Sequence, residues 1–113
     1  IYTTTKYAVV GLSEVLRKDL KTYNIGVSVL CPMGVYTKIT EAERNRPDPL
    51  RNPAEPLPHP PVEFLGRVLS SEEVARRTIE GIKKDQLYII THKEALKPIQ
   101  RRCERLIEAV PKE

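Results

Sequence analysis

The sequence predicts an α/β protein in which parallel strands alternate with helices. Two apolar runs, 25–31 and 87–91, are rich in β-branched residues and are typical of buried strands. Apolar residues at three- and four-residue steps predict amphipathic helices before, between and after these runs. Because a strand, a helix and a second strand form a βαβ crossover, the two strands are expected to be parallel. The predicted order is therefore helix, strand, lid, helix, strand, helix.

The first helix is predicted from an apolar stripe that begins near the amino end of the chain. We expect it to end near Tyr23, because Asn24 tolerates the left-handed conformation found after helices and Gly26 follows. The strand over 25–31 then stops at Pro32. The stripe comprises Ala8, Val9, Leu12, Leu16 and Leu20.

The segment 38–69 is predicted to be a lid, because seven of the ten prolines lie within residues 45–61. We expect no regular element at that proline density. His59 is expected to be a solvated loop residue. Two interpretations stay open for the apolar residues of the lid: they line an apolar substrate pocket, or they simply pack onto the domain. These residues are Val62, Phe64, Leu65, Val68 and Leu69.

The carboxy-terminal part is predicted to be helix, strand and helix. Ser70 and Glu73 have the spacing of a capping box, which places the start of the second helix at Ser70. The last helix is expected after Pro98. His92, beside charged neighbours, is expected in an exposed turn. The stripe of the last helix is Ile99, Cys103, Leu106, Ile107 and Val110.

Composition limits the class of protein. The 113 residues carry a net charge of +4, with 40% apolar and 30% charged residues, which suits one globular domain rather than a disordered chain. No apolar run approaches the ~20 residues that span a bilayer. Cys31 and Cys103 lack the spacing of a zinc site or a disulfide framework, so both are expected to be small buried apolar residues. The basic excess lacks interleaved aromatic residues, which argues against nucleic-acid binding.

Tyr2 and Lys6 are the first candidates for chemistry. Four residues apart on a helix, their side chains share one face. A neighbouring ammonium favours the phenolate form of a phenol, so such a pair makes a proton relay for an alcohol or carbonyl oxygen. The pair alone is weak evidence, because this spacing arises readily by chance and a surface tyrosine and lysine would look the same.

The position of residues 32–37 strengthens this hypothesis. The strand at 25–31 is expected to run back beside the first helix, which returns Pro32 to within about a turn of Lys6. In open parallel sheets, ligands bind just beyond the carboxyl ends of the strands. The sequence therefore predicts a ligand site formed by residues 32–37 and the start of the first helix.

These residues resemble the short-chain dehydrogenase/reductase family. Residues 2–17, YTTTKYAVVGLSEVLR, resemble its active-site helix, and residues 25–37, IGVSVLCPMGVYT, resemble its next strand and cofactor loop. EVA at 73–75 and YIITH at 88–92 resemble the end of many members. The resemblance implies the carboxy-terminal part of a Rossmann-like doubly wound parallel sheet, incomplete on its own. Residues 1–113 would be part of one NAD(P)-binding domain: 1–37 the active-site helix, strand and cofactor loop, 38–69 the proline-rich substrate lid, and 70–113 the rest.

The family resemblance assigns Tyr2 as the catalytic acid/base and Lys6 as the residue that activates it. Both would also contact the cofactor, Lys6 through a hydrogen bond to the nicotinamide ribose. The implied reaction is hydride transfer between NAD or NADP and an alcohol/carbonyl pair, and the implied partner is a small-molecule alcohol or ketone substrate.

The resemblance also assigns the cofactor loop. Pro32, Gly34 and Val35 would lie along the nicotinamide, with the Val35 backbone meeting its carboxamide. Thr37 would hydrogen-bond the carboxamide or a phosphate. Met33 stands where the resemblance would place a glycine, so this loop departs from the family's pattern at that residue.

The family's Gly-rich dinucleotide loop and its catalytic Ser and Asn precede the tyrosine. We therefore expect residues 1–113 to be a piece of a longer protein, and we expect this piece to be inactive alone. The longer protein is expected to be cytoplasmic and to form homodimers or homotetramers. Neither a metal nor a transmembrane segment is expected in the chain itself, and an amino-terminal part could carry a targeting or anchor segment. The competing hypothesis is a non-catalytic basic interaction module that binds an acidic partner through residues 93–110.

Overall fold

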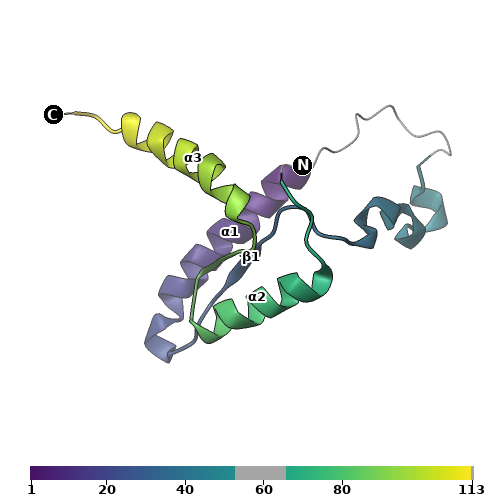
Figure 1. Ribbon diagram of the computed structural model, residues 1–113, viewed down its shortest axis with the longest axis horizontal. Coiled ribbons are helices and arrows are strands. Elements are labelled where there is room, and N and C mark those ends of the chain that lie inside the picture. The colour runs from purple at the N-terminus through teal and green to yellow at the C-terminus, as the bar shows by residue number, and fades with distance from the viewer. Residues whose placement is uncertain (53–65, 113) are drawn as a thin grey trace.

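The computed structural model describes residues 1–52 and 66–112 and confirms the predicted α/β class and order of elements (Figure 1). Short 3-10 helices η1 to η4 cover Lys21–Tyr23, Lys38–Asn45, Asp48–Leu50 and Lys93–Ala95. The main elements are α1 (Tyr2–Asp19), β1 (Val29–Cys31), α2 (Ser71–Lys83), β2 (Tyr88–Ile90) and α3 (Leu96–Glu108).

The two strands pair in parallel, as predicted, with Leu30 opposite Ile89. Each strand has three residues and is shorter than the predicted runs 25–31 and 87–91. The turn after α2 limits the pairing, because Asp85 takes a left-handed conformation (φ 52°) and the chain enters β2 only at Tyr88. Before β1, the Ser28 hydroxyl donates to the Gln86 carbonyl at 2.6 Å and extends the contact without a ladder.

The first helix is shorter than expected: α1 ends at Asp19, and the separate 3-10 helix η1 reaches Tyr23. The signals at Asn24 and Ser70 are confirmed. Asn24 adopts the left-handed conformation (φ 56°, ψ 35°) after η1. Ser70 caps α2, and its hydroxyl accepts a hydrogen bond from the Glu73 amide at 3.2 Å. The last helix was placed too late: α3 begins at Leu96, since proline is tolerated in the first turn, where Pro98 lies.

The described part of the proline-rich segment is not wholly irregular. η3 begins directly after Pro47 and carries a second proline in its first turn, which corrects the expectation that no regular element forms within 45–61. The backbone N–H of Asn52 donates to Glu43 Oε1 at 2.6 Å, and Arg44 Nη1 donates to the backbone carbonyl of Lys38 at 2.9 Å. Residues 38–52 are thus held together by their own hydrogen bonds.

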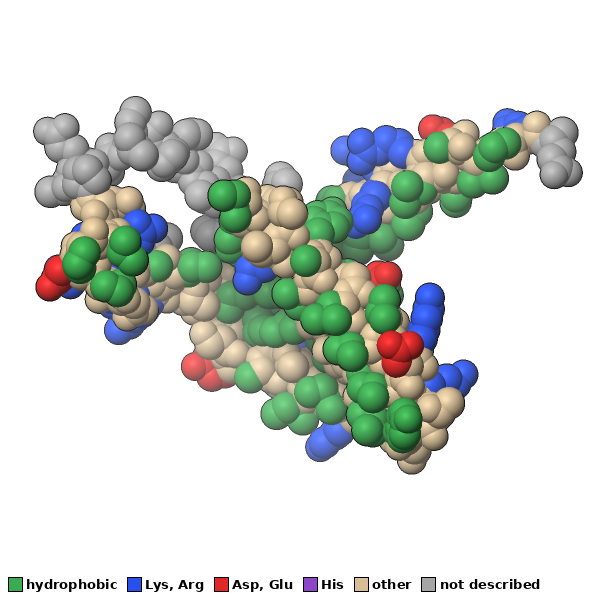
Figure 2. Space-filling view, turned by 180° about the vertical axis from the view of Figure 1, so that it is seen from behind, with side chains coloured by type: hydrophobic (Ala, Val, Ile, Leu, Met, Phe, Trp, Pro, Cys, Tyr) green, Lys and Arg blue, Asp and Glu red, His purple; other side chains and the backbone are tan. Residues whose placement is uncertain are grey.

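The core lies between α2 and the two strands. A Cβ atom on Gly81 of α2 would lie 2.6 Å from Ile89 Cγ1, so the absence of a side chain there lets the helix pack directly on β2. α1 and α3 contain no buried residue, and hydrophobic side chains lie uncovered along both helices (Figure 2). Among the described residues, the buried apolar side chains are Val29, Leu69, Val74 and Ile89.

Within the described ranges, no helix combines the length and apolar character needed to cross a membrane.

We predict that residues 1–113 expressed alone do not unfold cooperatively. So small a buried core offsets little of the conformational entropy that folding removes. A calorimetric scan should show a broad or absent transition, with aggregation through the uncovered strand edges. A sharp melting transition of a monomer would contradict this prediction.

Candidate active site

Tyr2 and Lys6 lie together on one face of the first turns of α1. Lys6 Nζ is 5.2 Å from the centre of the Tyr2 ring, within the range of a cation–π contact. Tyr2 is 66% exposed, so this residue is open to the surroundings of the fold. The structure thus brings together the two residues that the sequence paired.

The loop after β1 is fixed to the segment that precedes α2. Val35 forms an isolated parallel bridge with Leu69. The Leu69 amide donates to the Gly34 carbonyl at 3.0 Å, and the Tyr36 amide donates to the Leu69 carbonyl at 2.9 Å. In a parallel bridge of this pattern, the N–H and C=O of Val35 itself point away from Leu69. Within the described residues, neither of these two groups has a hydrogen-bond partner.

The other predicted loop residues differ in exposure. Pro32 and Thr37 are exposed, whereas Gly34 is buried. Thr37 caps η2, and its hydroxyl oxygen accepts from the Ile39 amide at 3.4 Å, which leaves its O–H free to donate.

The loop and the Tyr2–Lys6 pair lie toward the same end of the molecule. α1 contacts β1, and in Figure 1 the strand runs toward the end at which α1 begins. The carboxyl end of β1 is therefore the end that carries the candidate chemistry, as expected for a parallel sheet.

His92 contradicts its sequence expectation. It was expected in an exposed turn, but it is 2% exposed and lies directly beyond the carboxyl end of β2. His92 Nε2 is 3.0 Å from the Gly34 carbonyl, and Nδ1 is 2.7 Å from Thr91 Oγ1 and 3.4 Å from the Met33 amide. The charged residues that follow concealed this burial. The available signal was its position after a buried strand.

A charged pair on α2 holds the chain just before His92. Arg77 Nη1 donates to the Thr91 carbonyl, and Arg77 Nε donates to Glu73 Oε1 at 2.6 Å. Hydrogen bonds from Arg76 and Arg77 lower the pKa of Glu73 from 4.5 to about 2. The start of α2 is thereby tied to the end of β2.

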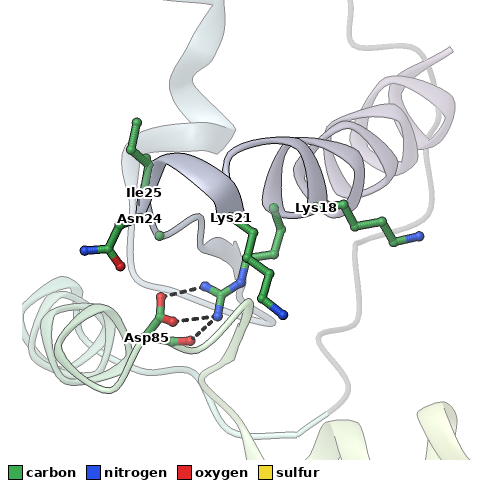
Figure 3. A pocket seen from close by; sticks show the side chains of 7 residues that line it. Lys18, Lys21, Asn24, Ile25 and Asp85 are labelled. Carbon is green, nitrogen blue, oxygen red and sulfur yellow. Dashed lines mark hydrogen bonds and ion pairs between the residues drawn. The ribbon is translucent and has the colours of Figure 1, made fainter.

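A second charged contact lies at the opposite end of β1. Arg17 makes a bidentate ion pair with Asp85, with N–O distances of 2.6 and 2.7 Å, and its Nη1 also donates to the Val27 carbonyl. Lys18 and Lys21 join them around a surface hollow of about 600 Å³ (Figure 3). The Arg17–Asp85 contact joins α1 to the turn between α2 and β2. None of the predicted site residues lines the hollow beside it.

Several sequence expectations concern residues outside this site. His59, Val62, Phe64 and Leu65 lie outside the described residues. Val68 is half-buried, and Leu69 is buried as the backbone partner of the loop.

The two cysteines do not both lie in the core. Cys31 is half-buried, and burial raises its pKa. Cys103 is exposed, contrary to expectation, because α3 does not pack on the core. In the part of the chain that the structure describes, no group of three or more His, Cys, Asp or Glu residues is placed to hold a metal ion.

Comparison with known proteins points to one family. A family model described as short chain dehydrogenase matches residues 1–48, which include Tyr2, Lys6 and the whole loop after β1. C alpha-dehydrogenase of Sphingobium sp. (strain NBRC 103272 / SYK-6) is 28% identical over 113 residues, covering 96% of this chain and 37% of that protein. CLA biosynthesis dehydrogenase/reductase of Lactiplantibacillus plantarum is 26% identical, covering 94% of this chain and 41% of that protein. 3-ketodihydrosphingosine reductase of Dictyostelium discoideum is 33% identical over 88 residues, covering 78% of this chain and 24% of that protein.

The match over residues 1–48 and the names of the relatives support a fragment of a short-chain dehydrogenase/reductase. The chain spans about two fifths of the length of the first two relatives.

The low pKa of Glu73 predicts acid sensitivity of the full natural chain. Because the folded-state pKa lies below the ordinary value of 4.5, the stabilisation by Glu73 is present above about pH 4.5 and is lost as the pH falls toward about 2. Glu73→Gln should melt below the wild type at pH 7, and the two melting temperatures should converge on acidification. Glu80→Gln is the control, since it removes one bond to Arg76 and leaves Arg77 in place. Parallel melting curves for wild type and Glu73→Gln at all pH values would contradict the prediction.

Proposed function

We propose that the protein containing this chain is an oxidoreductase that interconverts an alcohol and a carbonyl compound by hydride transfer with NAD or NADP. One observation carries the proposal: the Tyr2–Lys6 pair and the Val35 backbone groups that point away from Leu69 lie toward the same end of the fold, within the residues that match the family model. The relatives' names, dehydrogenase and reductase, support the reaction type. The family match favours this function over a basic interaction module.

Tyr2 is proposed as the acid/base. In the direction of reduction, the Tyr2 hydroxyl would give a proton to the carbonyl oxygen of the substrate while the carbonyl carbon receives the hydride. In the direction of oxidation the phenolate takes the proton from the alcohol. The Lys6 ammonium lies 5.2 Å from the centre of the Tyr2 ring, so its positive charge stands beside the group that would exchange the proton. The exposure of Tyr2 gives the substrate oxygen access to the hydroxyl.

The nicotinamide ring, when bound, supplies or accepts the hydride. The chain's own groups suit one end of that cofactor. A carboxamide carries both a donor and an acceptor, and Val35 offers an N–H and a C=O directed away from Leu69. The Thr37 hydroxyl supplies another donor, and Lys6 would bond the ribose. The proposal covers NAD and NADP alike, because these residues contact only the half that the two share.

The remainder of the dinucleotide site is proposed to lie upstream, in the part of the family fold that carries the Gly-rich loop. The divisions 1–37, 38–69 and 70–113 then correspond to active site, substrate lid and the end of one NAD(P)-binding domain. A lid with apolar residues suits a small alcohol or ketone with an apolar body, in a homodimeric or homotetrameric enzyme.

In the full natural chain, Tyr2→Phe should lower kcat by at least about 100-fold, because general acid–base catalysis contributes that much. NAD(P)H binding, followed by fluorescence, should change less than about threefold, since the phenyl ring remains and only the hydroxyl is lost. Lys6→Met should lower kcat and also weaken binding.

Tyr7→Phe is the matched control, because Tyr7 lies on the same helix and is 55% exposed. It should leave kcat unchanged. Near-normal turnover by Tyr2→Phe with an oxidisable alcohol would refute the proposed role of Tyr2.

A further inference from the structure

The Gly34 carbonyl is held from two sides. It accepts a hydrogen bond from the Leu69 amide at 3.0 Å, and His92 Nε2 lies at the same distance. Leu69 precedes α2 and His92 follows β2. The conformation of the loop after β1 therefore depends on residues that are distant in the sequence.

The contacts of His92 define its tautomer. A carbonyl oxygen can only accept, so Nε2 must carry a proton toward Gly34. The Met33 amide can only donate, and it reaches Nδ1 at 3.4 Å, so this contact assigns the ring's lone pair to Nδ1, which Thr91 Oγ1 also approaches at 2.7 Å. The contacts with Gly34 and Met33 therefore select the tautomer that carries its proton on Nε2.

The surroundings of His92 leave it little freedom. Its side chain and that of Thr91 are 2% and 0% exposed, and the Thr91 carbonyl is held by Arg77. Hydrogen bonds in such a buried place are strengthened by the low local dielectric, and leaving one unmade is costly.

Peptide geometry transmits this contact to Val35. The Gly34 C=O and the Val35 N–H belong to one planar trans peptide, so they point in opposite directions. Fixing the carbonyl toward His92 and Leu69 therefore fixes the Val35 N–H toward the opposite side.

We propose that His92 is a positioning residue for the cofactor loop: it orients the Gly34–Val35 peptide so that the Val35 backbone presents its N–H to the nicotinamide carboxamide. The inference rests on the proposed function, which it deepens by assigning a residue outside the Tyr–Lys pair and the loop.

Three variants of the full natural chain test the proposal. His92→Gln keeps a side-chain N–H at about the distance of Nε2 from the main chain, and His92→Leu removes this donor. Ile89→Val is the control, because it shortens a buried side chain of β2 that is not part of the loop. The dissociation constant for NAD(P)H should rise about tenfold in His92→Leu, the cost of one buried hydrogen bond. It should stay within about threefold in His92→Gln. Ile89→Val should lower the melting temperature without changing the dissociation constant.

Wild-type affinity in His92→Leu would overturn the proposal, as would equal weakening in His92→Gln and His92→Leu. Two further measurements need no cofactor. Nitrogen NMR of the wild-type imidazole should show a protonated Nε2 and an unprotonated Nδ1, and the Met33 amide should exchange faster in His92→Leu. A protonated Nδ1, or unchanged Met33 exchange, would overturn the proposal. If the wild type binds no dinucleotide, the proposed function fails, and these two readouts still decide whether His92 fixes the loop.

Discussion

The parallel pairing of β1 with β2 is the constraint on which the rest of the structure depends. Three residues on each strand bring the carboxyl ends of both to one edge. Met33 and Gly34 therefore lie beside His92, although 58 residues separate Gly34 from His92. At the other end, the Arg17–Asp85 ion pair joins α1 to the turn before β2.

The candidate site divides its work between side chains and backbone. The reactive side chains, Tyr2 and Lys6, stand on an exposed helix face, where a substrate oxygen can reach them. The proposed cofactor contacts come mainly from the main chain of Val35, whose direction is set by hydrogen bonds of Gly34 and Tyr36. Such a division makes the loop sensitive to anything that changes peptide orientation, even where no side chain of the site is altered.

Features governed by near neighbours in the sequence were predictable. The cap at Ser70 and the left-handed Asn24 depend on a few adjacent residues, and the shared face of Tyr2 and Lys6 follows from helix geometry. The strands were overestimated because their length depends on where the partner strand begins, and Asp85 delays that start.

Features governed by distant contacts were not predictable. His92 looked exposed beside Lys93 and Glu94, yet it is buried because the loop after β1 supplies its partners. Likewise Cys103 lies on an apolar stripe, and only the packing shows that this stripe is uncovered. The Val35–Leu69 bridge crosses the proline-rich segment, where no periodicity indicates pairing.

A crystal structure of the full natural chain with bound NAD(P)⁺ tests the central claim most directly, namely that residues 2–37 form the nicotinamide end of a dehydrogenase site. The account predicts the carboxamide within hydrogen-bond distance of the Val35 backbone, and a ribose hydroxyl within reach of Lys6 Nζ. A dinucleotide bound with its nicotinamide away from the carboxyl end of β1 would contradict it.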